Sequence, residues 1–224
     1  PIAAGGPRVM KFFVFGGDDA RVTAADLDGN GAKFIPNLCI ICHGSTKYTL
    51  GGPADVGARF LPFDLSSYQY DQVQGRGGQE AAFKQLNLGI IASNRSAATA
   101  ELIAEWYRDP AVAAPNTARA TQNDDAVPGG WAGHEALYLD VVRPTCRSCH
   151  VSRNPDLDFG SFTSFQNLAQ RATTAVCANR TMPNAKVNYQ RFWLQHLPAA
   201  AGGSMVGAIN AAGVTGWTGV PCPQ

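Results

Sequence analysis

Two short segments of the chain repeat one arrangement of two cysteines followed by a histidine. They are residues 39–43 (CIICH) and residues 146–150 (CRSCH). In the pattern C-x-x-C-H the two thiols add to the vinyl groups on one edge of a haem, and the adjacent histidine binds the iron. The repeated pattern therefore predicts two covalently attached haem c groups. The attachment residues are Cys39, Cys42, Cys146 and Cys149, and the proximal iron ligands are His43 and His150.

A single copy of this pattern also fits a thiol redox pair or half of a zinc site. A zinc site would require both cysteine pairs to share one ion. The two copies lie far apart in the sequence, and each of them ends in a histidine. We therefore favour haem attachment at both copies.

The second haem has a methionine candidate for its distal ligand. An electron-transfer haem with low-spin iron takes a second axial ligand, normally a methionine sulfur or a histidine nitrogen. Met182 follows His150 on a loop bounded by Pro183, between two predicted helices. We assign Met182 to the second iron; the alternative is that it only packs in the core.

The first haem lacks a nearby candidate, because no Met or His occurs between His43 and His134. Its distal ligand must come from another part of the chain or from a neighbouring subunit, unless the site is open and holds water. His134 is the first candidate, since it begins the helix that leads into the second motif. Met10 is the alternative. The other candidates in the chain are His196 and Met205.

The histidine count also permits two bis-histidine irons. The chain has four histidines, so His134 and His196 would complete the two irons and Met182 would be structural. Both irons would then have lower potentials than a His/Met iron.

Hydrophobic periodicity predicts helices around both motifs. The helix over residues 79–93 places Phe83, Leu86 and Ile90 on one face, and the next covers residues 96–108. In the second half we expect helices over residues 134–143, 163–173 and 189–197.

Outside these helices we expect little regular structure. Pro144 should end the helix over 134–143 just before the second motif. Residues 1–38 are glycine-rich and should be mostly loop with short helical pieces. Residues 111–130 should form a linker, and the tail from Ala199 should be irregular.

The second half of the chain resembles a small cytochrome c domain. The resemblance rests on the CRSCH motif, the loop around Met182 and the following helix with Phe192 and Trp193, and it covers roughly residues 130–200. It implies a compact helical fold in which a helix before the haem motif packs against the late aromatic helix.

In the first half the resemblance rests on the CIICH motif and on the helix that ends at Trp106 and Tyr107. This part departs from the family pattern, because no helix is predicted before Cys39. Both halves together imply an all-α fold of two cytochrome c-like helical haem domains with long loops. We place these domains at residues 1–125 and 126–224.

One further segment, residues 26–31, copies the opening D-x-D-x-N-G of a calcium-binding loop. The twelfth position of such a loop should be a bidentate glutamate, but here it is Asn37. A tight polar turn at Asn30 and Gly31 explains the segment better, so calcium is kept only as the alternative.

Three residues outside the predicted ligand set carry further expectations. Cys177 and Cys222 suit an oxidising compartment, and we expect a disulfide between them; the alternative is two separate buried thiols. Arg147, within the second motif, is expected either to pair with a haem propionate or to be solvated.

The composition of the chain and its haem motifs together restrict the partners and the cellular compartment that we expect. The net charge of +1 argues against nucleic acid, and no apolar run approaches the roughly 20 residues of a membrane helix. Because c-type haem is attached outside the cytoplasm, we expect a periplasmic or extracellular protein. The chain starts at Pro1 without a signal peptide, which we interpret as a mature or trimmed exported chain.

These features predict one-electron transfer with redox protein partners rather than catalysis. The rival prediction is a peroxidase-like di-haem enzyme, in which the first haem is the catalytic iron and the second relays electrons to it. A third is a subunit of a conductive assembly, a homo-oligomer or filament that stacks its haems with those of its neighbours. The absence of an acid/base constellation near residues 39–43 favours the electron carrier.

Overall fold

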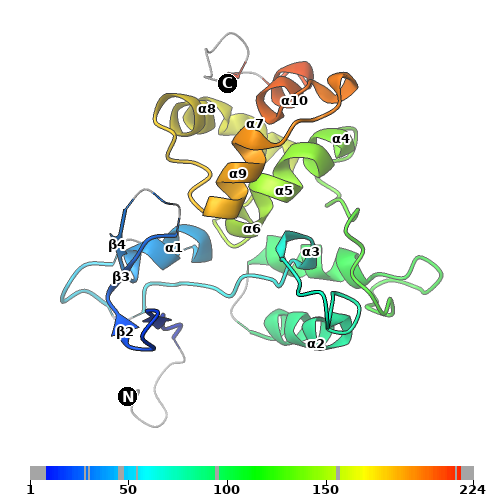
Figure 1. Cartoon of the computed structure of the whole chain (residues 1–224). Helices are drawn as coiled ribbons and strands as arrows, with labels where there is room; N and C mark the ends of the chain where they lie inside the picture. The colour runs from blue at the N-terminus through cyan, green and yellow to red at the C-terminus, as the bar shows by residue number, and fades with distance from the viewer. Residues whose placement is uncertain are drawn as a thin grey trace.

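The computed structural model describes residues 9–27, 29, 31–44, 48–53, 55–93, 96–154, 157–214 and 216–217. Over these ranges the chain is mainly helical, with 42% helix and 5% strand. The predicted helical character is therefore confirmed, and the strands found in these ranges belong to the N-terminal segment (Figure 1).

The N-terminal segment forms two small hairpins where short helical pieces were expected. β1 (Val14–Phe15) pairs with β2 (Arg21–Val22), and β3 (Ala24–Ala25) pairs with β4 (Lys33–Phe34), both antiparallel. The expectation was wrong because strands of two residues are too short to show a period in the sequence.

The turn between β3 and β4 is built on Asp26. Its carboxylate accepts hydrogen bonds from the N–H of Gly29 at 2.7 Å and of Gly31 at 3.1 Å. Both glycines have positive φ, 82° and 89°, which other residues rarely adopt. These contacts are those of a polar turn. Asp28 and Asn30 lie outside the described residues, so the calcium alternative stays untested.

The helices of the first half follow the prediction closely. Ser96 caps α3 by accepting a hydrogen bond from the N–H of Thr99 at 3.0 Å. Leu86, expected in the core, is 49% exposed, because the buried Asn87 beside it faces inward and bonds to the backbone of Phe63. The elements are α1 (Asn37–His43), η1 (Leu65–Ser67), α2 (Glu80–Ile91) and α3 (Ala97–Tyr107).

A nearly continuous helical run leads into the second motif. Pro144, which we expected to end the helix, lies within the run instead. A proline inside a helix removes one backbone hydrogen bond, and the segment just before it has π-helical rather than α-helical bonding. The run continues past Pro144 to His150. The run consists of α4 (Glu135–Leu137), the π segment η2 (Tyr138–Val142), α5 (Arg143–Thr145) and α6 (Arg147–His150).

The C-terminal part contains the two predicted helices and one that was not predicted. The tail from Ala199 forms α10, which Ser204 caps by accepting from the N–H of Gly207 at 3.0 Å. Met205 and Ile209 are 0% and 1% exposed, so burial stabilises a helix that its small residues do not predict. The elements are α7 (Phe162–Asn167), α8 (Ala169–Thr173), η3 (Thr174–Ala178), α9 (Lys186–Leu194), η4 (Ala199–Ala201) and α10 (Met205–Ala211).

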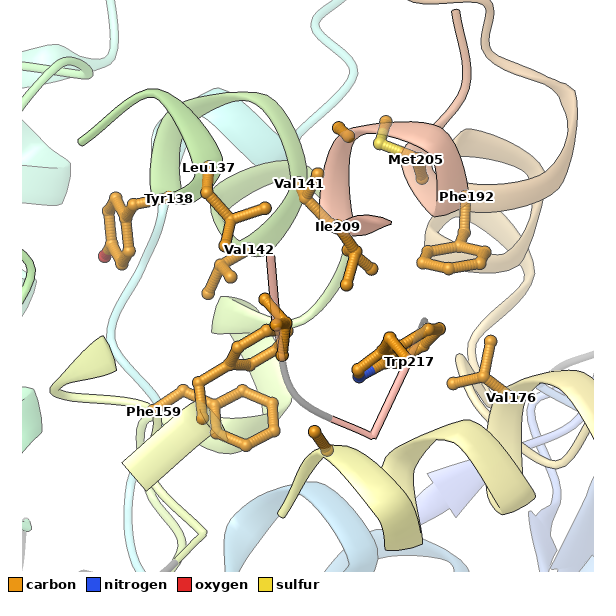
Figure 2. Packing of buried hydrophobic residues seen from close by; sticks show 14 of the residues in the cluster. Leu137, Tyr138, Val141, Val142, Phe159, Val176, Phe192, Met205, Ile209 and Trp217 are labelled. Atoms are coloured by element: carbon orange, nitrogen blue, oxygen red, sulfur yellow. The ribbon is translucent and has the colours of Figure 1, made fainter. Parts of the chain in front are cut away.

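The larger hydrophobic core lies where η2, α9 and α10 meet, and Figure 2 shows Val141, Val142, Phe192, Met205 and Ile209 converging there. A smaller core surrounds α3 and includes one residue that follows the second motif. The division at residue 125 is not tested by this arrangement. The members of the smaller core are Ile90, Leu102, Ile103, Trp106, Tyr107, Ala126 and Val151.

A buried ion pair joins the two halves of the chain. Arg147 donates to Asp64 Oδ2 from Nη2 at 2.7 Å and from Nε at 2.9 Å, and the two side chains are 2% and 3% exposed. The guanidinium also lies over the rings of Trp106 and Tyr138. The expectation of a solvated Arg147 is therefore wrong, and the charge partner found is a carboxylate of the first half; pairing with a propionate stays a prediction.

The predicted linker is anchored on the first half. Residues 111–130 contain no helix or strand. The N–H of Gln122 nevertheless donates to Glu80 Oε1 at 2.7 Å, and Asp124 accepts from Arg76 Nη2 at 2.8 Å. Polar contacts, rather than a regular element, therefore fix its path.

Two other predictions concern the remaining cysteines and the membrane. Cys177 is disulfide-bonded. Its predicted partner, Cys222, lies outside the described residues. Within the described ranges, no helix has the length and apolar character needed to cross a bilayer.

Replacing Asp64 by alanine should lower the free energy of unfolding by about 3–5 kcal/mol, because the buried guanidinium of Arg147 would keep its charge without a partner. Urea unfolding of the full chain measures this change. The matched control is Asp125→Ala, whose side chain is 80% exposed in its pair with Arg143 and should have almost no effect. Equal losses from the two variants would contradict a structural role for the buried pair.

Candidate haem sites

The fold brings the two cysteine–histidine motifs into direct contact. α1 and α6 pack against each other near the centre of the molecule, and Cys42 Sγ lies 2.9 Å from Cys149 Sγ (Figure 1). Gly44 makes this approach sterically feasible, because a Cβ at its position would lie 2.2 Å from the carbonyl oxygen of Ser152. The sequence predicted both motifs but not that they would meet.

Both histidines are held in the form that binds a metal. His43 Nδ1 lies 2.8 Å from the carbonyl oxygen of Arg59, and His150 Nδ1 lies 2.7 Å from that of Leu157. A carbonyl only accepts hydrogen bonds, so each Nδ1 carries the proton and each Nε2 keeps its lone pair. Iron–histidine sites use this same arrangement to fix the tautomer and the ring orientation.

Burial keeps both imidazoles neutral. It lowers the pKa of His150 to about 4 and also lowers the pKa of His43. Aromatic rings restrict both side chains: Phe159 stacks on His150 at 4.0 Å, and Phe12 meets His43 edge-on at 5.0 Å. The two imidazoles are therefore neutral and oriented, as binding of a metal through Nε2 would require.

A cavity of about 980 Å³ lies beside the second motif. Its size is at the upper end of the range for small-molecule and cofactor sites. Met182 lines the same cavity as His150, which places the predicted proximal and distal ligands around one space. The other lining residues important here are Cys146, Cys149, Trp217 and, from α1, Ile41.

The lining of this cavity fits a haem. Its walls include the rings of Phe159, Phe165 and Phe192, which suit the apolar face of a porphyrin. Trp217 is 3% exposed, and its buried indole N–H has no acceptor in the described part of the chain. A haem propionate would supply an acceptor, and Arg171, also in the lining, a counter-charge.

The described residues offer no group of three or more His, Cys, Asp or Glu that could hold a bare metal ion. A haem iron does not require such a group, because the porphyrin nitrogens supply most of its ligands and the protein one or two. The contact between the motifs removes the argument from sequence distance against a shared zinc ion, but the described residues do not assemble the ligands that such an ion needs.

The structure does not bring the first candidate for the remaining iron, His134, to the first motif. Its ring stacks on Phe162 at 3.5 Å, and α4, which it precedes, is well separated from α1 in Figure 1. Met10 lies closer to the site, since it is half-buried and precedes Phe12, which contacts His43.

The other two candidates occupy unsuitable places. His196 is exposed beyond the end of α9. Met205 is fully buried in the larger core, where Figure 2 shows it among apolar side chains. A bis-histidine pair of irons would require His134 and His196 to leave these positions.

Sequence reasoning missed the backbone and side-chain partners of the motifs. The carbonyls of Arg59 and Leu157 carry no signal in the sequence, because any residue has a carbonyl. Arg59 and Arg153 also bind across the motif contact, and no motif or spacing in the sequence singles them out.

No protein-family model, curated protein or solved structure matches this chain. The interpretation of the site therefore depends on the geometry of its own residues. It is supported by the cysteines, the fixed imidazoles and the lined cavity.

In the chain without haem, glutathione disulfide should join Cys42 to Cys149 rather than close either motif, because their Sγ atoms are 2.9 Å apart. The hydrogen bond to Cys149 lowers the pKa of Cys42, which makes it the readier attacking thiolate. Proteolysis and mass spectrometry of the non-reduced full chain detect the cross-linked peptide.

The control Cys149→Ser should remove this cross-link. Disulfides found only within motifs, joining Cys39 to Cys42 and Cys146 to Cys149, would contradict the packing of α1 on α6.

Proposed function

We propose that this protein is a di-haem c-type cytochrome that transfers single electrons outside the cytoplasm. One observation carries the proposal: the histidine of each motif donates its Nδ1 proton to a backbone carbonyl, at 2.8 and 2.7 Å, and so presents Nε2 for iron. A thiol redox pair would not require two fixed imidazoles, and the described residues contain no group of three or more His, Cys, Asp or Glu that could hold a shared zinc ion.

The residues of the chain have distinct parts in this function. Cys39 and Cys42 anchor the first haem, and Cys146 and Cys149 anchor the second. Haem supplies the one-electron redox couple when bound. The protein sets its potential through axial ligands, burial and hydrogen bonds. Met182 is proposed as the distal ligand in the cavity of the second motif, where a thioether favours reduced iron.

The finer features of the fold belong to this proposal as well. The two halves are proposed as cytochrome c-like haem domains, supported in the second half by η2 and α9, which share one core. The partners are proposed to be redox proteins that exchange electrons with an exposed haem edge. The compartment is proposed to be periplasmic or extracellular, because c-type haem is attached there.

The peroxidase-like alternative depends on an open first iron. It is favoured by the position of His134, which is stacked on Phe162 and does not approach His43. Cyanide binding to the oxidised holoprotein distinguishes the two functions: an electron carrier with two six-coordinate irons should not bind it, and an open catalytic iron should. A rise in particle size with concentration would instead favour the homo-oligomeric assembly.

Native protein should have the polypeptide mass plus two haem groups. Mass spectrometry under denaturing conditions measures this, because thioether bonds survive unfolding. The double variant Cys39→Ala/Cys42→Ala should lose one haem, whereas the matched control Cys177→Ala should keep both. The bare polypeptide mass in native material would overturn the proposed function.

Met182→Ala should abolish the red charge-transfer band of methionine-ligated haem and lower the potential of the second iron, because the thioether is lost. Absorption spectra of the oxidised protein and a potentiometric titration measure these changes. Met205→Leu, a volume-conserving change in the core, is the control and should leave the band unchanged. If the band survives in Met182→Ala and is lost in Met10→Ala, the methionine ligand belongs to the first iron and Met182 is not a ligand.

A further inference from the structure

Two arginines, one from each half of the chain, donate hydrogen bonds to the backbone at or beside the motif of the other half. Arg153 follows the second motif, but its Nη1 donates to the carbonyl oxygens of Ile40 at 3.2 Å and Ile41 at 2.9 Å. These carbonyls lie in the last turn of α1, the helix of the first motif. A helix leaves its last carbonyls without intrahelical partners, and a cation at this end also complements the helix dipole.

Arg59 makes the reciprocal connection. Its own carbonyl oxygen accepts the Nδ1 proton of His43, the proximal ligand of the first motif. Its Nη1 donates to the carbonyl oxygens of Ser152 at 3.4 Å and Arg153 at 3.2 Å, in the turn that follows α6. One residue therefore orients a histidine of one motif and binds the backbone of the other.

These bonds place two half-buried cations at the contact where the motifs meet. Arg153 lines the cavity beside the second motif and bonds to the helix of the first, whereas Arg59 bonds to the turn that follows the second motif. A fixed positive charge near an iron disfavours the ferric state, which carries one more positive charge than the ferrous state. Partial burial limits the screening of this charge by water and salt.

We propose that Arg59 and Arg153 are positioning residues that clamp the two motifs into one unit and raise the potentials of the irons at both motifs. This inference rests on the proposed function, because it requires a haem at each motif. It differs from that function because it assigns one shared electrostatic environment to both irons. The potential of each iron then depends on residues from both halves of the chain.

The test is a potentiometric titration of the full-length holoprotein carrying Arg153→Gln. Both haems should shift toward the oxidised form, the first by about tenfold in its redox equilibrium constant, which is about 59 mV for a one-electron couple. Once Met10→Ala has been shown to leave the band of methionine ligation unchanged, that band reports the second haem, and the remaining absorbance change reports the first. Arg59→Gln should shift both haems in the same direction.

Two further variants separate charge from structure. Arg153→Lys keeps the positive charge, so both potentials should lie close to those of the unmodified protein. A merely structural loss at this position would lower them in the Lys variant as well. Arg108→Gln removes an arginine whose partner is Glu105 on α3, and it should leave both potentials unchanged. If Arg153→Gln fails to retain haem, Arg59→Gln and Arg153→Lys still test the effect on both potentials.

The possible results separate a failure of the arginine clamp from a failure of the proposed cytochrome function. Native protein without haem would overturn both. Two attached haems, with each arginine variant shifting only one haem or neither haem, would overturn the clamp and leave the cytochrome in place. A shift of both haems in both variants supports the clamp.

Discussion

The packing of α1 on α6 is the contact on which the arrangement of the candidate site depends. It brings the Sγ atoms of Cys42 and Cys149 to 2.9 Å and requires a glycine at position 44, where a side chain would meet the backbone of the other motif. Two haems attached here would share one attachment region. The redox potentials of the two haems, which separate domains set independently in a tandem cytochrome, would then be coupled through common charges and backbone contacts.

The two halves are held together by polar as well as apolar burial. Arg147, within the second motif, forms a buried ion pair with Asp64 of the first half. Gln122 extends this network by donating to Asp64 at 3.3 Å. Burying two charges is costly unless both are paired and bonded, so this network fixes one relative arrangement of the halves. Val151 in the smaller core has the same effect by apolar contact.

The helices that could be predicted are those whose buried face repeats along the sequence. α3 is the clearest case, since Leu102, Ile103, Trp106 and Tyr107 are all buried as expected. α10 was missed because its stability comes from a cap and from burial of Met205, neither of which appears as a period. The N-terminal hairpins were missed for the same reason, as their pairing is not a local property.

Residue type and spacing alone select the side chains of the candidate site, because two thiols and an imidazole at C-x-x-C-H spacing can act on one haem edge within a single turn of chain. Only the folded chain shows that the motifs meet and that the carbonyls of Arg59 and Leu157 orient the imidazoles. The pairing of Arg147 with Asp64 is likewise a tertiary contact. The motif contact joins cysteines 107 positions apart. Such contacts depend on the path of the chain between their partners, which no local spacing encodes.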